Sequence, residues 1–304
     1  MKNYPMDLIE FEKEFNTEEQ CREYLLKLRY ENGVYVCPKC GSDKSWTVKQ
    51  TIHECCDCKY QSSVIAGTIF QDTHKPLTLW FRAIWHITAQ KNGTSALSLQ
   101  KILGLGSYRT AWLWLHKLRR AMIRPGRDKI SGIVEVDETY IGGESQGGKR
   151  GRGTENKVLV AVAVEINDKK IGRIRMAVID DASSDSLHCF VEETIEKGST
   201  IVTDGWSGYN GLSQKGYVQE IKKQKDDQSM LPHVHTAISL LKRWLLGTLQ
   251  GACSKEHFAY YLDEYTFRFN RRKSKSRGML FYRLLQNAVQ VEPSTYDDII
   301  AKSE

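Results

Sequence analysis

Four cysteines stand in two close pairs near the start of the sequence. Cys37 and Cys40 form one CxxC pair, Cys55 and Cys58 form a second, and fourteen residues separate the pairs. A CxxC segment can turn so that both thiolates face one ion, and two such segments complete a tetrahedral site of four sulfurs, which suits zinc. Protein ligands fill all four positions, so the spacing predicts a closed, structural zinc site in a zinc ribbon. Buried thiols or a redox pair are the alternative, but a paired set is more specific than a single CxxC.

The other cysteines lack this spacing. Cys56 is a spare thiol beside the second pair, and three isolated cysteines are expected in the core: Cys21, Cys189 and Cys253.

Two aspartates each follow an apolar run. Asp137 ends the run from Ile133 and Asp204 ends the run from Ser199, so each is expected to close a strand and face a loop. A helix expected from about Val234 carries His235 near its start, and Lys242 lies seven residues on. Seven residues are about two helical turns, so these two side chains share a face.

Two aspartates and a third ligand at one edge of a sheet can hold a pair of Mg²⁺ or Mn²⁺ ions about 3.5–4 Å apart. This is the chemistry of phosphodiester cleavage and strand transfer. Strand-terminal aspartates are also common turn formers, so the spacing alone leaves that alternative open. His233 is a second candidate for the third ligand, while Glu138 points to the opposite face if the strand continues.

The charge of the chain is unevenly distributed. The net charge is +7, and residues 101–130 alone contain eight Lys or Arg against one Asp. Residues 242–283 contain ten Lys or Arg against three acidic residues, so the rest of the chain is acidic. Two basic blocks favour contact with a polyanion, although solvated helix faces would give the same pattern.

Several segments position these residues. Residues 1–30 are expected to form an acidic amphipathic helix with a capping box from Thr17 to Gln20, and a helix with an apolar stripe is expected after Pro76. A short helix from about Ser95, a turn at residues 104–106 and a longer helix capped by Ser107 form the pattern of a helix-turn-helix. An ordinary helical hairpin is the alternative.

The helix-turn-helix and the flexible or basic segments supply the candidate DNA contacts. They are Arg109, Lys117, Arg119 and Arg120 in the second helix, Lys149, Arg150 and Arg152 in a Gly-rich loop, and Arg271, Arg272 and Lys273 in the second basic block.

The region after Pro125 changes to strand periodicity. Strands are expected over 133–137, 157–166, 173–179 and 199–204, with a helix over 184–196. The continuous Val, Ile and Ala runs fit a sheet that is buried on both faces in an α/β domain. Asp263 and Glu264 lie on a later helix and are expected to be packing residues rather than a third catalytic carboxylate.

The composition excludes several classes of protein. Apolar residues are 40% and charged residues 27% of the 304 residues, which argues against a disordered or fibrous chain. No segment reaches the roughly 18 uncharged apolar residues that a membrane span needs. The first residues are acidic where a signal peptide is basic and apolar, so we expect a cytoplasmic protein.

Seven motifs occur in one order along the chain. They are CPKCGS, the VIAGTIF after the second cysteine pair, SYRTAW, VEVDETYIGG, TDGWSGY, SLLKRWLLGT and YLDEYTFRFNRR. With these motifs the sequence resembles the bacterial and archaeal insertion-sequence transposases that join a zinc ribbon to an RNase-H-like DDE-type domain, in the ISXO2-like group. The resemblance covers nearly the whole chain.

The resemblance implies a role for each matched residue. The first two aspartates of the family's triad fall on Asp137 and Asp204, and the third position, which is Glu, Asn or His in the family, falls on His235. The lysine seven residues beyond it falls on Lys242. Imidazole departs from the three-carboxylate pattern and suits Mn²⁺ better than Mg²⁺.

The resemblance also implies an architecture and a function. The expected fold is an α+β multidomain chain with a helical segment at 1–30, a zinc ribbon at 31–70, a helix-turn-helix region at 71–128, an RNase-H-like mixed-sheet domain at 129–290 and an acidic tail at 291–304. The expected function is cleavage of double-stranded DNA at terminal inverted repeats and transfer into target DNA, by a homodimer or larger assembly. A non-catalytic zinc-ribbon regulator derived from a transposase is the alternative.

Overall fold

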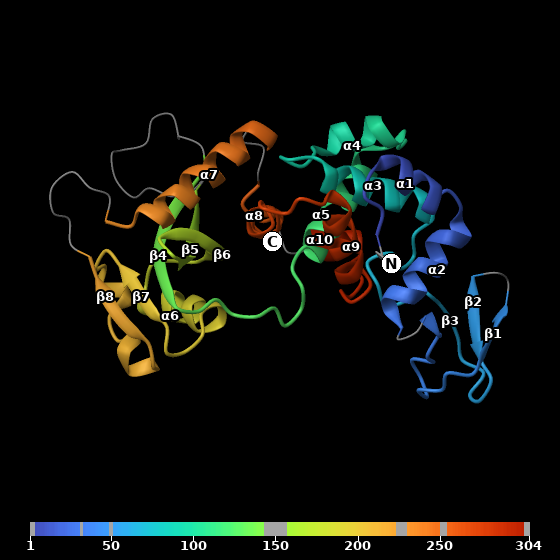
Figure 1. The fold of residues 1–304 in the computed structure, drawn as a ribbon, viewed down its shortest axis with the longest axis horizontal. Coiled ribbons are helices and arrows are strands. Elements are labelled where there is room, and N and C mark those ends of the chain that lie inside the picture. The colour runs from blue at the N-terminus through green and yellow to red at the C-terminus, as the bar shows by residue number, and fades with distance from the viewer. Residues whose placement is uncertain are drawn as a thin grey trace. The chain divides into compact units, whose positions relative to one another are not determined.

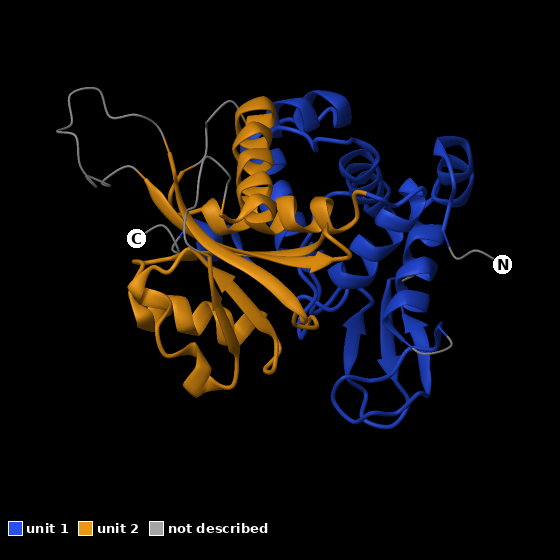
Figure 2. Ribbon diagram, turned by 60° about the vertical axis from the view of Figure 1, so that its left-hand side comes forward, with its two compact units in different colours: residues 1–126, 273–301 blue, residues 127–272, 302–304 orange. Residues whose placement is uncertain are grey.

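The computed structural model describes residues 4–30, 33–48, 51–142, 157–222, 230–249 and 254–300. Its contacts divide the chain into two compact units (Figure 2). The first unit contains residues 1–126 and 273–301, and the second contains residues 127–272 with 302–304. None of the helices that the structure describes is long and apolar enough to cross a membrane.

The first unit begins with two helices where one was expected. Helix α1 spans Leu8–Glu14 and α2 spans Glu18–Arg29 (Figure 1). Thr17 separates them because its side chain accepts a hydrogen bond from the backbone N–H of Gln20, whose own side chain accepts one from the N–H of Thr17. The predicted capping box is therefore confirmed, and it begins a new helix.

The ribbon follows as a small antiparallel sheet. Its strands β1 (Ser45–Val48), β2 (Ile52–Cys55) and β3 (Gln61–Ser63) pair in sequence order. Tyr35, Cys37 and Cys55 form a small buried cluster beside it. A cluster this small calls for a metal to stabilise the fold.

Five further helices lie in the described residues of the first unit. Helix α3 (Leu77–Ala89) starts after Pro76, α4 (Ala96–Leu103) has Ser95 as its N-cap and Gly104 as a left-handed C-cap, and α5 (Tyr108–Ala121) follows Ser107. The predicted helix-turn-helix arrangement of elements is thus present.

Helix α9 (Arg277–Ala288) packs on α3, where the rings of Trp85 and Phe281 lie 5.6 Å apart, and α10 (Tyr296–Ile300) packs on α5. The expected domain ending at residue 290 differs from this division, which places residues 273–290 in the first unit.

The second unit is built on a five-stranded mixed sheet with the order β6-β5-β4-β7-β8. Strands β4 (Ile133–Ile141), β5 (Val158–Asn167) and β6 (Lys170–Ile179) are antiparallel, whereas β7 (Thr200–Thr203) and β8 (Val218–Ile221) continue parallel to β4. Two short 3₁₀ helices, η2 (Ser207–Tyr209) and η3 (Leu212–Lys215), lie between β7 and β8. Strand β8 was not predicted from the sequence.

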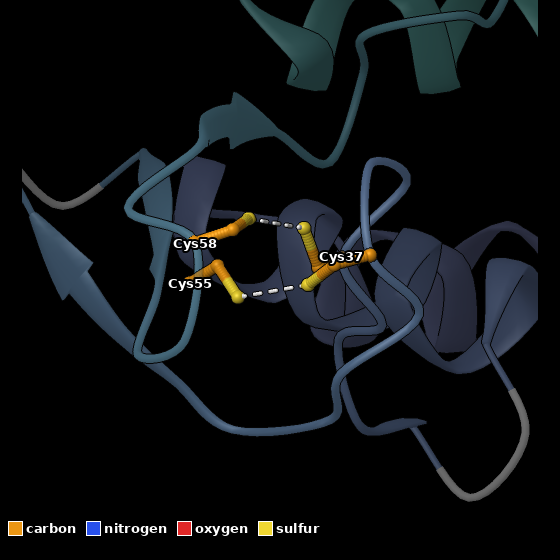
Figure 3. A group of neighbouring side chains, drawn as sticks. Cys37, Cys55 and Cys58 are labelled. Atoms are coloured by element: carbon orange, nitrogen blue, oxygen red, sulfur yellow. Dashed lines mark hydrogen bonds between the residues drawn. The ribbon is translucent and has the colours of Figure 1, made fainter.

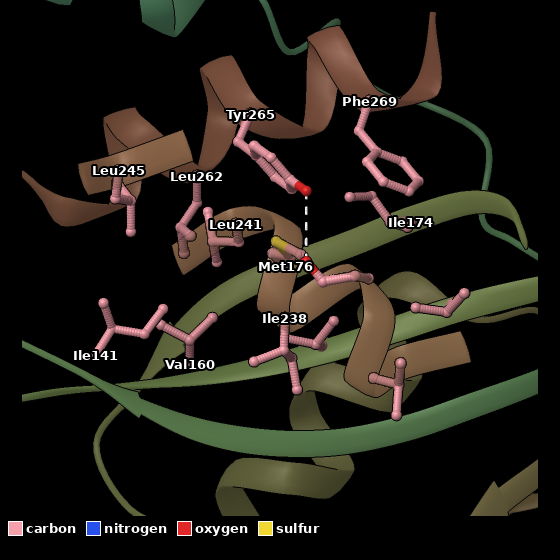
Figure 4. Close-up of a cluster of buried hydrophobic side chains, with 14 of the residues drawn as sticks. Ile141, Val160, Ile174, Met176, Ile238, Leu241, Leu245, Leu262, Tyr265 and Phe269 are labelled. Atoms are coloured by element: carbon pink, nitrogen blue, oxygen red, sulfur yellow. Dashed lines mark hydrogen bonds between the residues drawn. The ribbon is translucent and has the colours of Figure 1, made fainter. Parts of the chain in front are cut away.

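Helices cover both faces of this sheet, as the apolar runs predict. Helix α6 (Ser184–Thr194) packs on the face that carries Val134, Val136 and Ile201. Helices α7 (Pro232–Leu249) and α8 (Phe258–Asn270) pack on the other face, where Figure 4 shows side chains of both helices over Ile174 and Met176. We call this second side the α7 face; residues of β4 alternate between the two faces.

Candidate active site

The four predicted zinc ligands converge in the ribbon. The Sγ atoms of Cys37 and Cys58 lie 3.6 Å apart and those of Cys40 and Cys55 lie 3.5 Å apart (Figure 3). Among the described residues, these four form the group of ligand atoms that all lie within 4.8 Å of one another. Tetrahedral zinc with bonds of about 2.3 Å separates its sulfurs by about 3.8 Å, so the cluster fits a structural zinc ion.

The electrostatics of the cluster also call for a cation. Backbone N–H groups of Cys58 and Asp57 lower the pKa of Cys55 to about 6. A backbone N–H of Ser42 acts in the same direction on Cys40, but the nearby sulfurs of Cys58 and Cys55 outweigh it and raise the pKa of Cys40 to about 12. Four thiolates at this spacing repel one another, and a divalent ion removes that repulsion.

The remaining cysteines differ from the prediction in part. Cys21 is buried as expected, and Cys56 is half-buried. Cys189 is exposed on α6, so its prediction as a core residue is wrong; it lies on the solvent side of a helix whose other side covers the sheet. Cys253 lies outside the described residues.

Asp137 and Asp204 lie side by side on the α7 face. Strands β4 and β7 pair in parallel with Glu135 opposite Val202; Asp137 is two residues further along β4, and Asp204 is the residue directly after the end of β7. The expectation that both aspartates close a strand is correct for Asp204 and wrong for Asp137. Strand β4 continues to Ile141 because its other edge stays paired with β5, while its pairing with the shorter β7 has ended.

Asp204 begins the turn that follows β7. Its Oδ1 accepts a hydrogen bond of 2.9 Å from the backbone N–H of Trp206, and Gly205 between them has a φ of +89°, which favours glycine. Asp204 is exposed. The turn-forming role considered for this residue is therefore present, and the second carboxylate oxygen remains available to a ligand.

His235 reaches Asp137 from the first turns of α7. Its Nε2 lies 3.2 Å from Oδ2 of Asp137, with 47% of the His235 side chain and 17% of the Asp137 side chain exposed. Burial raises the pKa of Asp137, and the nearby charge of Asp204 acts in the same direction, while the N–H of Glu138 and the imidazole of His235 oppose the shift. A divalent cation would compensate the same two carboxylates.

The donor set of this site fits a hard or borderline divalent ion. Two carboxylates and an imidazole are ligands of Mn²⁺ and Mg²⁺, and the exposed side of the site leaves room for further oxygen ligands. The site is more open than the cysteine cluster: the ligand atoms of Asp137, Asp204 and His235, all of them described residues, are not all within 4.8 Å of one another.

A buried glutamate lies beside these residues and was not predicted. Glu135 has a fully buried side chain on the α7 face, and its carboxylate accepts hydrogen bonds from the backbone N–H groups of His233 and Val234 at 2.8 and 2.9 Å. Its other oxygen lies 2.8 Å from Nδ1 of His233. His233, the alternative third ligand, is thereby turned toward Glu135. The sequence feature that could have identified Glu135 is its charged side chain within an apolar strand, two positions before Asp137.

Lys242 lies on the solvent side of α7, two turns beyond His235, as the spacing predicts. An open hollow of about 590 Å³ runs along this side of the helix and is lined by Pro232, His235, Thr236, Ser239, Leu240 and Arg243. The cationic residue that lines this hollow is therefore Arg243, which was not predicted, rather than its neighbour Lys242.

The other acidic residues near the motifs have structural partners. Glu138 points to the face opposite Asp137, as expected, and accepts a hydrogen bond of 2.7 Å from the hydroxyl of Tyr209. Glu264 is buried and forms an ion pair of 2.7 Å with Arg268 one helical turn away. Burial raises the pKa of Asp263 to about 7, despite the charge of Arg127 nearby. These contacts agree with packing roles on α8.

The predicted DNA contacts on α5 are largely engaged within their own unit. Arg109 is exposed but its guanidinium lies 3.5 Å from the ring centre of Tyr296 on α10, and Arg120 donates to the hydroxyl of Ser294. Burial lowers the pKa of the half-buried Lys117. Arg119 is only 2% exposed, so the prediction that it contacts DNA is not supported: it lies on the side of α5 that packs into the unit.

The other predicted DNA contacts differ in their surroundings. Arg271 and Arg272 lie over the rings of Phe267 and Phe269, both at 4.1 Å, and Arg272 also donates to the carbonyl oxygens of Ile171 and Gly172. Lys273 is exposed. The basic residues of the Gly-rich loop, Lys149, Arg150 and Arg152, lie outside the described residues.

Comparison with known proteins identifies the two regions. Residues 16–61 match the transposase zinc-ribbon domain, and residues 129–270 match the ISXO2-like transposase domain. A protein described as an uncharacterized protein in transposable element ISH50, from Halobacterium salinarum, is 27% identical over 281 residues, which covers 84% of this chain and 92% of that protein. The two domain matches cover more than half of the chain in the order that the motifs predict, and the chain belongs to the transposases that join a zinc ribbon to an ISXO2-like domain.

Proposed function

We propose that the chain is a metal-dependent transposase that cleaves DNA at the ends of its own element and joins the freed 3′ ends to target DNA. One observation carries the proposal. Asp137 on β4 and Asp204 directly after β7 each lie two positions beyond the paired residues Glu135 and Val202, and His235 approaches Asp137 to 3.2 Å from α7.

The three side chains would hold the catalytic ions. Mg²⁺ or Mn²⁺ bound here would activate the attacking hydroxyl group and stabilise the leaving oxygen. Asp137 supplies a carboxylate that is mostly shielded from water, which strengthens its attraction for a cation. Asp204 and His235 are exposed and leave the site accessible to a DNA strand.

The side of α7 that faces solvent would position the DNA backbone. Lys242 offers a compact positive charge two turns from His235, and Arg243 lines the hollow that His235 also lines. A lysine and an arginine on this side of α7 are suited to contact successive phosphates of a DNA strand.

The ribbon and the helix-turn-helix would recognise the terminal inverted repeats. Tyr108 and Arg109 are exposed at the start of α5. In a helix-turn-helix, the start of the second helix is the part that contacts bases in the major groove. Bringing two element ends together would require a homodimer or larger assembly.

Two other functions make different predictions. A regulator derived from a transposase would bind the ends without cutting them, and an RNase-H-like nuclease would cut without joining. The family match and the paired aspartates favour the transposase.

The test uses the DNA that flanks the gene. Inverted repeats on both sides would supply a labelled end substrate for a gel-shift assay and for cleavage with Mg²⁺ or Mn²⁺. We expect binding, metal-dependent cleavage at the repeat and products joined to a target plasmid. Binding without cleavage in either metal would favour the regulator, and cleavage without joined products would favour the nuclease.

A further inference from the structure

Glu135 places a carboxyl side chain in the interior of the second unit, on the central strand β4 of its sheet. Its side chain is fully buried, and it lies on the same face of β4 as Asp137, two residues away. An ionised carboxylate in such a place is costly unless hydrogen bonds satisfy its oxygens. The contacts of Glu135 therefore indicate why the charge is tolerated.

Both oxygens of Glu135 contact the first turn of α7. One accepts the N–H groups of His233 and Val234, at 2.8 and 2.9 Å, and the other lies 2.8 Å from Nδ1 of His233. The first N–H groups of a helix have no partner within the helix, and a negative charge at that end also interacts favourably with the helix dipole. Glu135 thus takes the part of an N-cap, although it comes from a distant strand.

His233 extends this anchor to a second point. Its Nε2 lies 3.2 Å from the carbonyl oxygen of Lys169, in the turn between β5 and β6. Lys169 and Asp168 both have left-handed backbone conformations, with φ of +62° and +48°, so the turn has a defined shape. The first turn of α7 is held to the central strand and to this turn together.

His235 follows directly after the anchored residues. It comes one residue after Val234, and its Nε2 lies 3.2 Å from Asp137. Glu135 and Asp137 project from one face of the same strand, and His233 and His235 belong to the same helical turn. Fixing His233 to Glu135 therefore sets the distance between His235 and Asp137.

We propose that Glu135 is a positioning residue that fixes the start of α7 and thereby holds His235 at Asp137. The inference rests on the proposed function, in which these two residues bind the catalytic metal. It is distinct from a role of Glu135 as a ligand, because hydrogen-bond donors of α7 already face both of its oxygens.

Two substitutions separate these roles in the full-length zinc-loaded protein. Glu135→Ala removes the acceptor for both N–H groups. Glu135→Gln removes the charge but keeps a carbonyl for both N–H groups, and its amide can donate to Nδ1 of a neutral His233 that keeps its proton on Nε2. A positioning residue tolerates glutamine, whereas a metal ligand does not.

Glu165→Ala is the matched control. Glu165 is also a buried glutamate of the same sheet, on β5, but its carboxylate pairs with Arg173 at 2.7 Å rather than with α7. Its loss reports the general effect of removing a buried carboxylate from this sheet.

Two measurements are needed, amide hydrogen exchange over α7 and Mn²⁺ binding followed by electron paramagnetic resonance. We expect Glu135→Ala to increase exchange selectively over the first turns of α7 and to weaken Mn²⁺ binding about 10- to 100-fold, as loss of a supporting partner of a metal ligand does. Glu135→Gln should remain close to the wild type in both measurements, and Glu165→Ala should leave the start of α7 protected.

Three results would overturn the inference. Glu135→Gln losing Mn²⁺ as completely as Glu135→Ala, with α7 still protected, would make Glu135 a ligand. Exchange that rises throughout the sheet, as in Glu165→Ala, would make its role generally structural, and unchanged exchange in Glu135→Ala would remove the anchor. If the wild type binds no Mn²⁺, the proposed function fails, while the exchange measurement still decides whether Glu135 fixes α7.

Discussion

The cysteine cluster and the candidate active site of this chain contrast in how their residues are assembled. The zinc ribbon takes four sulfurs from two short turns between Cys37 and Cys58, and all four ligand atoms lie within 4.8 Å of one another. The candidate active site takes its residues from β4, from the turn after β7 and from α7, and one of them, His235, has a side chain that is 47% exposed. The first arrangement encloses an ion, and the second leaves coordination positions open.

The difference shows what each site depends on. Local turns build the ribbon site, so its ion is part of the fold. The candidate active site depends on the pairing of two strands and on the anchoring of a helix, so an ion bound there would bind a fold that exists without it. Removal of the metal, and of single ligands, should therefore have different consequences at the two sites.

The largest expected effect is the loss of zinc. Cys55→Ser should abolish zinc binding and unfold the ribbon, because structural zinc contributes on the order of 10–16 kcal/mol of binding free energy that is also folding free energy. Zinc content and amide exchange over β1–β3 measure this. Cys56→Ser is the control, since Cys56 is adjacent but lies outside the cluster, and it should keep the metal. A zinc-loaded, protected ribbon in Cys55→Ser would contradict the assignment.

The next effect is the loss of cleavage at the active site without loss of the fold. Asp137→Asn should lower the rate of end cleavage by about 10³-fold or more while end binding stays unchanged. Cleavage of a labelled end and a gel shift are compared in the same preparation. Asp185→Asn removes an exposed carboxylate from α6, on the other side of the sheet, and should cleave normally. An Asp137→Asn protein that still cuts would disprove the site.

A smaller effect concerns the choice of metal. With an imidazole among its ligands, the site should use Mn²⁺ at least as well as Mg²⁺, and His235→Glu should shift the preference toward Mg²⁺. Cleavage rates over a titration of each metal test this. A strict requirement for Mg²⁺ in the wild type would count against His235 as a ligand.

The smallest expected effect concerns Asp263, a second aspartate whose pKa is raised but which lies outside the candidate active site. Burial raises the pKa of Asp263 on α8 to about 7, compared with 3.8 in an unperturbed aspartate. Its protonated form is favoured in the fold, so the contribution to stability is complete below 3.8 and is lost as the pH rises through about 7.

Asp263→Asn should consequently raise the melting temperature by a few degrees above neutral pH and change it little in acid, with cleavage unaffected. Thermal unfolding as a function of pH measures the first part. A loss of cleavage in this variant would move the active site toward α8, and an equal stabilisation at all pH values would show that titration of Asp263 is not the cause.

The ribbon and the main helices could be predicted because their signals are local. The cysteine spacing, Pro76, Ser95 and Gly104 each act within a few residues, and each predicted feature is present. Strand β8 escaped prediction because Val218 and Ile221 are exposed at the edge of the sheet, without a clear alternation. Strand β4 was predicted too short because the polar residues after Asp137 resemble a loop, and only the pairing with β5 extends it.

The residues of the candidate active site could be proposed from the sequence, but their geometry could not. The motifs identify Asp137, Asp204 and His235, whereas the contact that holds α7 connects Glu135 with residues almost a hundred positions away. Charge was the weakest guide. Arg119 is buried and Arg109 lies over Tyr296, because a basic residue can serve the packing of its own unit as well as a phosphate.

The most direct test of the account is to locate bound Mn²⁺ by its anomalous X-ray scattering in crystals of the zinc-loaded protein. We expect Mn²⁺ on the α7 face of the sheet, with Asp137, Asp204 and His235 among its ligands, and zinc alone at the four cysteines. Mn²⁺ bound elsewhere in the second unit, or no Mn²⁺ under conditions that support cleavage, would contradict it.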